Sequence, residues 1–442
     1  MEQTNLLGTS FNCKCGKQHI VPTKHRFYED NAFDLLLDTA KSITDGLNYL
    51  ILADTRTFEA AGRIVEEKLK FGAAGVSHFI VPDNDGESPA ADAGTKDLIL
   101  DQAPPADLYI AVGSGVINDL VKWVAFLRDK PYITVATAAS MNGYASANVA
   151  ATIDGLKVLF HANACQAVFA VPEIIINAPF ELTTSGLGDV LAKSVSSADW
   201  RLNKFLFNDY YCQFSVDLLK KLEPVYLDNP GEIKEKNPTA FKALFEALFL
   251  SSIAMTITGT SSPASGGEHL ISHTIDMTAD RDGRKHDFHG RQVGVSSILT
   301  AALYERVMAI DKPTFIDMPD TINSEFWGSL SPVVEKEYAK KIPKFDQAAE
   351  FLSQPKNWDR LKALIKPDLV PPVKLKNCLM QAGGAHRFMD IRDNGLPLKK
   401  DKFLLIVKHA NQMRERFTIL DLALMIGITF EEIEQLVEKW VS

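Results

Sequence analysis

The chain has 442 residues, 46% hydrophobic and 23% charged, a balance that excludes a disordered protein and supplies a large core. Its length exceeds one ordinary domain, so two domains are expected. The formal net charge of -9 argues against a nucleic-acid or anionic-membrane partner, although a local basic pocket can still take a small anion. We find no signal peptide and no apolar run of about 18 residues. The five scattered cysteines indicate reduced thiols and a cytoplasmic protein.

Strands and helices alternate over the first part of the chain. Buried strands are predicted at 47–54, 76–82, 107–113, 132–138 and 167–172, with helices at 55–70 and 115–129. Alternating apolar residues over 147–160, around Asp154-Gly155, predict a hairpin. This alternation is typical of a Rossmann-like parallel sheet with helices on both faces.

After Pro179 helical periodicity dominates, as in "TAFKALFEALFLSSIAMTITG" and "QVGVSSILTAALYERVMAI". Runs typical of strands are nearly absent there. We therefore expect an α/β fold with a parallel-sheet domain over 1–179 and an all-α domain over 180–442.

Three stretches in the first domain suit a nucleotide. Gly113-Ser114-Gly115 lies between a strand and a helix, where backbone N–H groups can meet a phosphate, or where a tight turn serves no ligand. The next strand ends in "TAASMNGYAS" (137–146), which suits a ligand crevice or an ordinary polar loop. Asp54 ends an earlier strand, so its carboxylate can accept bonds from a ribose, cap the following helix, or do both.

Histidines mark the second domain. His269 and His273 in "SGGEHLISHTID" are four residues apart and share one helical face. Together with Asp189 and His289, they offer the carboxylate and imidazole ligands that suit a catalytic divalent ion with open positions. Two alternatives remain open. The histidines can be a buried hydrogen-bonded pair, and Asp189 can be the cap of a helix that begins close to it.

The N-terminal segment carries Cys13, Cys15 and His19, which together resemble a zinc knuckle. They supply three ligands at most and no second CxxC follows, so a solvated hairpin is the favoured interpretation.

Four motifs occur in order: GSGVIND after a strand, TAAS followed by a glycine, SGLGDVLAK, and SGGEHLISH followed by HG. Over nearly the whole chain they resemble the iron-containing alcohol dehydrogenase and dehydroquinate synthase superfamily. Within it the sequence is most similar to the sn-glycerol-1-phosphate dehydrogenases, whose bacterial members share a CxCG segment and an ending like "RERFTILDLA".

The resemblance implies a dinucleotide-binding domain over 1–179 and a metal- and substrate-binding domain over 180–442. It implies zinc or nickel bound by Asp189, His269 and His289, and a substrate contacted by Asp189 and His273. The implied NAD or NADP contacts are Asp54, Gly113, Ser114, Gly115, Val116, Ile117, Thr137, Ser140 and Ser146.

One residue departs from the family pattern. Asn142 stands where the family has a substrate-contacting Asp, so this position keeps an acceptor, gains a donor and loses a charge. The departure leaves the identity of the substrate open. From charge alone, the candidate partners of a substrate phosphate are Lys193, Arg281, Arg284 and Lys285.

The resemblance therefore implies an NAD(P)- and metal-dependent oxidoreductase, self-associating, that interconverts dihydroxyacetone phosphate and sn-glycerol 1-phosphate, or a related polyol phosphate. Hydride transfer is expected in the interdomain cleft, with Asp189 and His273 as catalytic residues. Alternatives on the same scaffold are a dehydrogenase of glycerol or another polyol and a lyase of the dehydroquinate-synthase type. An alternative of another class is a non-catalytic protein that binds nucleotide and metal.

Overall fold

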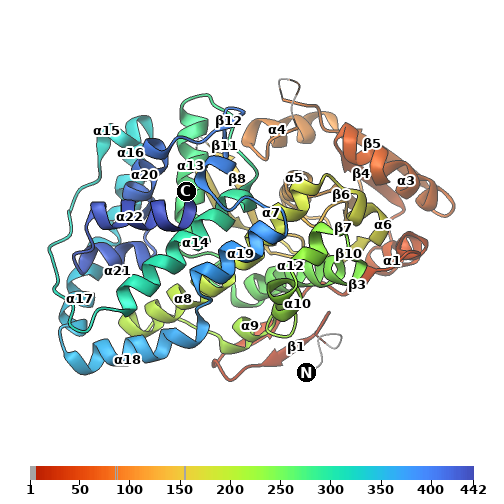
Figure 1. The fold of residues 1–442 in the computed structure, drawn as a ribbon. Helices are drawn as coiled ribbons and strands as arrows, with labels where there is room; N and C mark the ends of the chain where they lie inside the picture. The colour runs from red at the N-terminus through yellow and green to blue at the C-terminus, as the bar shows by residue number, and fades with distance from the viewer. Residues whose placement is uncertain (1–5, 85, 87, 154–155) are drawn as a thin grey trace. The chain divides into compact units, whose positions relative to one another are not determined.

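The structure, a computed structural model, describes residues 6–84, 86, 88–153 and 156–442 (Figure 1). The chain divides into two compact units. Unit 1 comprises Met1–Gly186, Asp217–Tyr226 and Glu235–Thr260, and unit 2 comprises Leu187–Val216, Leu227–Lys234 and Ser261–Ser442. Two segments from the later part of the sequence, Asp217–Tyr226 and Glu235–Thr260, thus belong to unit 1. Separate domains at 1–179 and 180–442 stay a prediction.

Unit 1 is built on a six-stranded sheet in the order β3-β10-β7-β6-β4-β5 (Figure 1). Every pairing in it is parallel, which confirms the predicted sheet. The strands are β3 (His25–Tyr28), β4 (Asn48–Ala53), β5 (Gly75–Ile80), β6 (Leu108–Gly113), β7 (Tyr132–Ala136) and β10 (Ala167–Ala170).

Two antiparallel hairpins accompany the sheet. One joins β1 (Ser10–Asn12) to β2 (Gln18–Ile20), and the other joins β8 (Asn148–Ile153) to β9 (Leu156–His161). The second confirms the predicted hairpin, although its turn residues Asp154-Gly155 lie outside the described residues.

Most crossovers of the sheet are helical, whereas the connection from β7 to β10 contains the β8–β9 hairpin. The helices of these crossovers are η2 (Ala32–Leu35), α1 (Leu36–Ile43), α2 (Thr55–Thr57), η3 (Phe58–Gly62), α3 (Arg63–Lys70), α4 (Ala93–Gln102) and α5 (Gly115–Leu127), and α6 (Pro172–Asn177) follows β10. Later helices complete the unit or lead out of it: α7 (Phe180–Leu191), α10 (Glu223–Asp228) and α12 (Pro238–Thr258).

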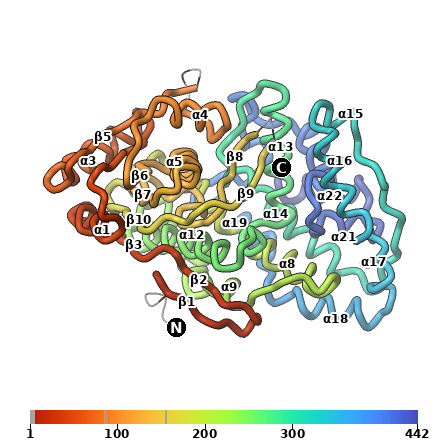
Figure 2. Tube along the Cα trace, turned by 180° about the vertical axis from the view of Figure 1, so that it is seen from behind, coloured from red at the N-terminus to blue at the C-terminus, as the bar shows by residue number. Residues whose placement is uncertain are grey.

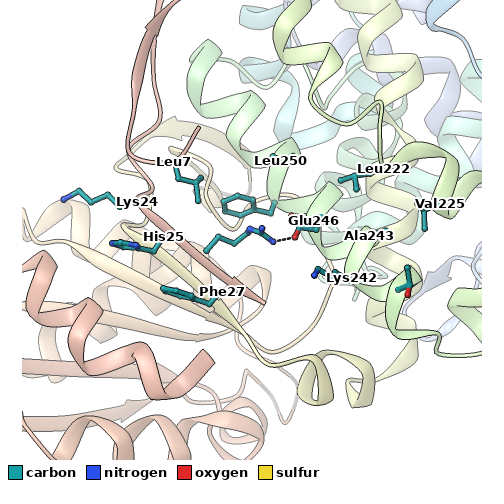
Figure 3. Close-up of a pocket in the computed structure, with 13 residues that line it drawn as sticks. Leu7, Lys24, His25, Phe27, Leu222, Val225, Lys242, Ala243, Glu246 and Leu250 are labelled. Atoms are coloured by element: carbon teal, nitrogen blue, oxygen red, sulfur yellow. Dashed lines mark hydrogen bonds and ion pairs between the residues drawn. The ribbon is translucent and has the colours of Figure 1, made fainter. Parts of the chain in front are cut away.

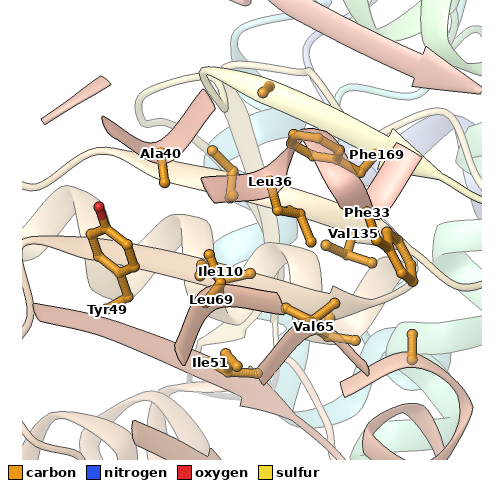
Figure 4. Close-up of a cluster of buried hydrophobic side chains, with 14 of the residues drawn as sticks. Phe33, Leu36, Ala40, Tyr49, Ile51, Val65, Leu69, Ile110, Val135 and Phe169 are labelled. Atoms are coloured by element: carbon orange, nitrogen blue, oxygen red, sulfur yellow. The ribbon is translucent and has the colours of Figure 1, made fainter. Parts of the chain in front are cut away.

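The inner strands of the sheet, β4, β6, β7 and β10, are buried on both faces. On one face Phe33 and Leu36, together with Val65 and Leu69 of α3, cover Ile110 and its neighbours (Figure 4). On the other face α5 packs against β6 and β7, as Figure 2 also shows. Because water reaches neither face, the central strands read as continuous apolar runs rather than alternating ones.

The strand order places a topological switch point between β4 and β6. From β4 the chain moves outward to β5 and then crosses to β6 on the other side of β4. The carboxyl ends of β4 and β6 therefore lie at the edge where parallel sheets bind ligands. Asp54 follows β4 and Gly113-Ser114 ends β6, so both lie at this edge.

A separate cavity of about 550 Å³ lies elsewhere in unit 1, lined by Lys24 and His25 at the start of β3 and by Glu246 and Leu250 of α12 (Figure 3). Arg26 forms an ion pair with Glu246 in it. This cavity adjoins the edge strand β3, and its lining contains no residue from the carboxyl ends of β4 and β6, where such sheets bind ligands, so we do not assign the nucleotide to it.

Helix α12 has 21 residues and is the single described helix long and apolar enough to cross a membrane. Of its most apolar window, 83% is buried inside the protein. Core helices of soluble proteins have the same composition, so α12 is weak evidence for a membrane span.

Unit 2 is helical in its described residues, apart from the two-residue strands β11 (Arg392–Asp393) and β12 (Leu396–Pro397). Its main helices are α8 (Lys193–Phe207), α13 (Gly267–Arg281), α14 (His289–Met308), α17 (Ile342–Leu352), α18 (Pro355–Ile365), α19 (Pro372–Gln381), α20 (Lys400–His409) and α22 (Phe430–Val441). Shorter segments are α9 (Gln213–Asp217), α11 (Gly231–Lys234), α15 (Ser324–Trp327), η4 (Gly328–Leu330), α16 (Ser331–Ala339), η5 (Lys366–Asp368), η6 (Phe388–Asp390), η7 (Ala410–Met413) and α21 (Ile419–Met425).

A buried lysine fixes the loop that follows β7. Lys122 of α5 is fully buried, and its Nζ donates to Asp119 Oδ1, Ser146 Oγ and the carbonyls of Gly143 and Asn148 at 2.8–3.2 Å. The ammonium thus has an anionic partner and three further acceptors, which offset the cost of removing it from water.

We predict that Lys122→Met lowers the free energy of unfolding by about 3 kcal/mol, since the Asp119 carboxylate loses its buried cation and two carbonyls each lose one donor. Urea unfolding measures the loss. Lys130→Met is the matched control: Lys130 is 44% exposed and 3.9 Å from Asp107, so its removal should change stability by less than about 1 kcal/mol. Equal effects of the two substitutions would contradict the structural role of Lys122.

Candidate active site

Asp189 lies in the last turn of α7, which runs from Phe180 to Leu191. The expectation of a carboxylate near a helix start is wrong, and so is the alternative that Asp189 caps that helix. A negative charge at a helix C-terminus is disfavoured by the helix dipole, and Asp189 is only 2% exposed. Its oppositely charged neighbour is His269, whose Nε2 lies 3.6 Å from Asp189 Oδ1.

Close backbone contact brings Asp189 to His289. A Cβ atom on Gly188 would lie 2.0 Å from the carbonyl oxygen of Gly290, so only glycine allows this approach of α7 to α14. His289 is the first residue of α14, and its neighbour Gly290 makes the contact. The contact between Gly188 and Gly290 therefore brings their sequence neighbours Asp189 and His289 close together.

Helix α13 presents His269 and His273, and two buried carboxylates hold its first turn. Asp199 of α8 accepts a hydrogen bond from Gly267 N (2.7 Å), and Glu268 accepts one from Gly266 N (2.7 Å). Asp199 also accepts bonds from Ile419 N and the Tyr304 hydroxyl. Burial and the charge of Glu268 raise the pKa of Asp199 to about 7, although these hydrogen bonds lower it.

The structure brings Asp189, His269 and His289 together within unit 2. One ligand atom from each lies within 4.8 Å of the other two. His269 Nε2 is 3.6 Å from Asp189 Oδ1, close to the separation of about 3.3 Å between two ligands of a tetrahedral zinc ion. The rings of His269 and His289 are 5.0 Å apart between centroids.

Hydrogen bonds fix which nitrogen of each ring faces the cluster. His269 Nδ1 donates to Glu268 Oε1 at 2.8 Å, which leaves Nε2 toward Asp189. Ser272 donates its single hydroxyl proton to Gln292 Oε1 (2.8 Å), so it accepts from His289 Nδ1 (3.1 Å). In its neutral form each imidazole therefore has its lone pair on Nε2, as a metal ligand requires.

The charges around His269 favour a cation at this point. Burial lowers the pKa of His269, but hydrogen bonds to Asp189 and Glu268 outweigh burial and raise it to about 9. Two carboxylates thus attract positive charge to one buried imidazole, and a divalent ion would supply that charge in place of the proton. The three residues fit a metal centre by donor type, spacing and orientation.

His273 is one turn beyond His269 and nearly parallel to His289, with ring centroids 5.3 Å apart. It belongs to a second group, with Asp276 and His289, whose ligand atoms also lie within 4.8 Å of one another. Asp276 is occupied in a different way, since its Oδ1 accepts from Gln292 Nε2 (3.0 Å) and pairs with His286 (3.2 Å). We therefore favour Asp189, and not Asp276, as the carboxylate ligand.

The nucleotide candidates lie together at the carboxyl edge of the sheet in unit 1. The N-cap of α5 is Ser114, whose side chain makes no capping bond, so the helix start with Gly115, Val116 and Ile117 keeps its backbone donors. Thr137 N donates to Gly113 O at 3.2 Å, which joins the β7 loop to this turn. Ser140 and Asn142 lie in that loop, which Lys122 holds through Ser146 and Gly143.

Asp54 is the N-cap of α2 and forms a capping box with Thr57. The cap prediction is confirmed. One carboxylate oxygen accepts from Thr57 N (2.9 Å), and the group lies 3.5 Å from Arg56 Nε. Contact of Asp54 with a ribose stays a prediction, as do the other cofactor contacts.

The arginines near the end of α13 are paired with carboxylates, so they are less available to a substrate phosphate than the sequence suggests. Arg281 pairs with Asp282, and Arg284 pairs with Asp282 and Asp393. Lys193 begins α8, one turn beyond Asp189. A phosphate contact by Lys193 or Lys285 stays a prediction.

Sequence reasoning did not find the residues behind the metal candidates. Glu268, Ser272, Gln292 and Asp199 orient the two imidazoles and the start of α13. An available signal was Glu268 itself, a charged residue between two glycines and a histidine in a segment that is otherwise apolar or small.

The chain is similar to known proteins both in sequence and in structure. The sequence model of the family described as iron-containing alcohol dehydrogenase matches residues 31–179. A glycerol dehydrogenase of Schizosaccharomyces pombe has a similar structure, with a TM-score of 0.60, 15% identity and coverage of 95% of this chain and 90% of that one. A Red Sea brine pool alcohol dehydrogenase gives 0.58 at 12% identity, covering 95% and 98%. The fold is that of the iron-containing alcohol dehydrogenases.

Sequence similarity to curated proteins indicates a more specific family within this class. The glycerol-1-phosphate dehydrogenase [NAD(P)+] of Bacillus subtilis is 31% identical over 73% of this chain and 79% of its own. That of Halalkalibacterium halodurans is 34% identical over 59% of this chain, and the match spans 65% of that relative. That of Geobacillus stearothermophilus is 28% identical over 95% and 98%. The chain belongs to the glycerol-1-phosphate dehydrogenase family.

We predict that Glu268→Gln lowers metal affinity about 10- to 100-fold, because the neutral amide no longer orients and polarises His269 through Nδ1. Competition with a metal-sensitive dye, followed by elemental analysis, measures the change. Glu305→Gln, an exposed change on α14, is the control and should bind metal like the wild type. Unchanged affinity in Glu268→Gln would show that this carboxylate does not support the centre.

Proposed function

We propose that this protein interconverts dihydroxyacetone phosphate and sn-glycerol 1-phosphate with NAD(P) and one divalent metal ion. The observation that carries the proposal is the group of Asp189 and His269, both buried, with the partly buried His289, in which hydrogen bonds orient both imidazoles. The names of the curated relatives support the same reaction.

Residues 1–179 form the dinucleotide-binding part of this proposal and residues 180–442 the metal- and substrate-binding part. The pyrophosphate lies on the start of α5, at Gly113 to Ile117, with Thr137, Ser140 and Ser146 beside it. Asp54 accepts from the ribose. Arg56 is half exposed beside Asp54 and pairs with Asp83 through two hydrogen bonds, so it would have to exchange Asp83 for the extra phosphate of NADP.

Zinc or nickel at the centre supplies a Lewis acid for the substrate oxygen, and the nicotinamide supplies or accepts the hydride. The side chains around them bind and orient. Asp189 and His273 hold the substrate hydroxyls, and His273 exchanges the proton that accompanies hydride transfer. Only 8% of His273 is exposed, so bulk water competes poorly for that proton.

Asn142 bears on the substrate. Its amide donates as well as accepts, and it lacks the negative charge that an aspartate would place near a phosphorylated substrate. This supports a polyol phosphate over a neutral polyol such as glycerol. We also propose a cytoplasmic homo-oligomer, from the reduced cysteines and from the family resemblance.

We predict that the purified protein oxidises NADH or NADPH with dihydroxyacetone phosphate, and that this activity is lost after exhaustive chelation. Zinc or nickel should restore it. The absorbance of the reduced cofactor measures turnover. Activity that survives chelation would contradict the role of the metal.

Substrate controls distinguish the alternatives in that assay. Asn142→Asp should retain metal and cofactor binding and change only the preference among polyol phosphates. Equal turnover of unphosphorylated glycerol would rule out phosphate recognition. Phosphate release without net cofactor change would instead indicate a lyase, and tight cofactor binding without turnover a non-catalytic protein.

A second prediction separates the two histidine roles. His289→Ala should abolish metal binding, whereas His273→Gln should keep the metal and lower kcat by about 100-fold or more, because proton transfer is lost. Elemental analysis and steady-state kinetics on the same preparations measure both. Asp276→Asn tests the second group of ligands. Loss of metal in His273→Gln and Asp276→Asn, with retention in Asp189→Asn, would assign the ion to that group instead.

A further inference from the structure

The N-terminal hairpin of unit 1 gathers two thiols and an imidazole around one point. Cys13 and Cys15 lie in its turn and His19 lies on β2, where it is paired with Phe11 of β1. One ligand atom from each of Cys13, Cys15 and His19 lies within 4.8 Å of the others. The sequence suggested a solvated hairpin, yet His19 is fully buried.

The turn itself has the geometry that directs both thiols to one side. Gly16 N donates to Cys13 O at 3.0 Å, and Cys13 N donates to Lys17 O at 2.9 Å. Gly16 has φ +88°, a conformation that residues with a side chain rarely adopt. The turn brings Cys15 Sγ to 3.3 Å from His19 Nε2.

His19 is held with its lone pair toward the sulfurs. Its Nδ1 is 2.6 Å from the carbonyl oxygen of Ile257 at the end of α12, and a carbonyl can only accept, so Nδ1 carries the proton. In this tautomer Nε2 is the acceptor that faces Cys15 Sγ. A ligating histidine whose other nitrogen donates to a backbone carbonyl is the usual arrangement at metal sites. The ring of Phe11 packs edge-on against His19, with centroids 5.4 Å apart.

We propose that Cys13, Cys15 and His19 bind a second metal ion of the zinc type, distinct from the candidate catalytic centre. A sulfur and a nitrogen on tetrahedral zinc are about 3.6 Å apart, close to the observed 3.3 Å. Thiolate and imidazole donors select zinc over magnesium or calcium. None of the five cysteines is in a disulfide within the described chain.

The ion has a structural role in this proposal. Binding releases the two thiol protons to solvent and fixes the turn of the hairpin. His19 already connects β2 to α12 through Ile257, so the ion links the turn to the core of unit 1. A structural zinc has four ligands, and Cys165 is a poor fourth because its thiol donates to Tyr144 O inside the sheet unit. The fourth position remains for another thiolate or for water.

Cobalt distinguishes the two metal sites in the intact protein. The candidate catalytic centre has only oxygen and nitrogen ligands, so a sulfur-to-cobalt charge-transfer band reports the hairpin alone. We expect this band in the cobalt-loaded wild type and about two metal ions per chain. Cys13→Ser and Cys15→Ser should each abolish the band and about one equivalent of metal. Turnover should change by less than about twofold, because no residue of the hairpin belongs to the candidate active site.

The controls keep the result decisive. Lys14→Ser changes an exposed residue between the two cysteines and should retain the band. Cys165→Ser, Cys212→Ser and Cys378→Ser then identify a fourth sulfur by a weakened band. No band in the wild type, or an unchanged band in Cys15→Ser, overturns the proposal.

Should the cysteine variants fail to fold, alkylation of the wild type decides. Cys13 and Cys15 are partly exposed, so bound zinc should protect them and a chelator should make them reactive. Equal labelling with and without the chelator overturns the proposal. The cobalt band, the metal content and the labelling do not depend on the proposed dehydrogenase activity.

Discussion

The start of α13 depends on two carboxylates that are completely removed from water. Asp199 and Glu268 accept the backbone N–H groups of Gly267 and Gly266, and Glu268 also accepts from His269. Arg416 lies close enough for both charges to act on it, and it donates to the carbonyl of Ser265 and the hydroxyl of Ser261. Buried charges without such partners would cost several kcal/mol each, so the segment before His269 has one stable conformation. The position of every histidine on α13 follows from it.

The same arrangement explains why the candidate metal centre can be rigid. Asp189 and His289 are located by a backbone contact at Gly188, while His269 is located by the carboxylates on the other side. Helices α7, α13 and α14 each contribute one ligand, and none of these side chains relies on a loop for its orientation. Ligands on rigid elements keep their separation when the metal leaves, which favours rapid and selective rebinding.

Much of the fold was predictable, because the parallel sheet leaves a strong pattern. The runs ending in Ala53, Gly113 and Ala136 are apolar throughout, as strands buried on both faces must be. The edge strand His25–Tyr28 was missed, since it is short, half-buried and mixed in composition. The start of α7 was also missed: "FELTTSGLGDVL" contains two glycines and two threonines, which hide the helix from a propensity argument. Because of that error, Asp189 was expected at the beginning of a helix, whereas it lies at the end of α7.

The candidate site was predictable only in part, for a related reason. A motif names the residues that carry reactive atoms, so Asp189, His269 and His289 could be selected. Residues that orient them act through space, and Gln292 or Asp199 has no local pattern that marks it. The hairpin shows the reverse case, in which Cys13, Cys15 and His19 were noticed and set aside. What the sequence lacked was the bond from His19 to Ile257, which is 238 residues away.

The bonds made by Lys122 have a consequence for natural variation in this family. Lys122, Asn118 and Ser146 all meet at the loop after β7: Asn118 and Lys122 both donate to Gly143 O, and Lys122 donates to Ser146. A change at one of the three leaves a buried donor or acceptor in the others without its partner, so substitution there should be tolerated mainly when the positions change together. Ser146 would then be retained in relatives for the sake of the loop, and its presence in a sequence alone says little about which cofactor that relative uses.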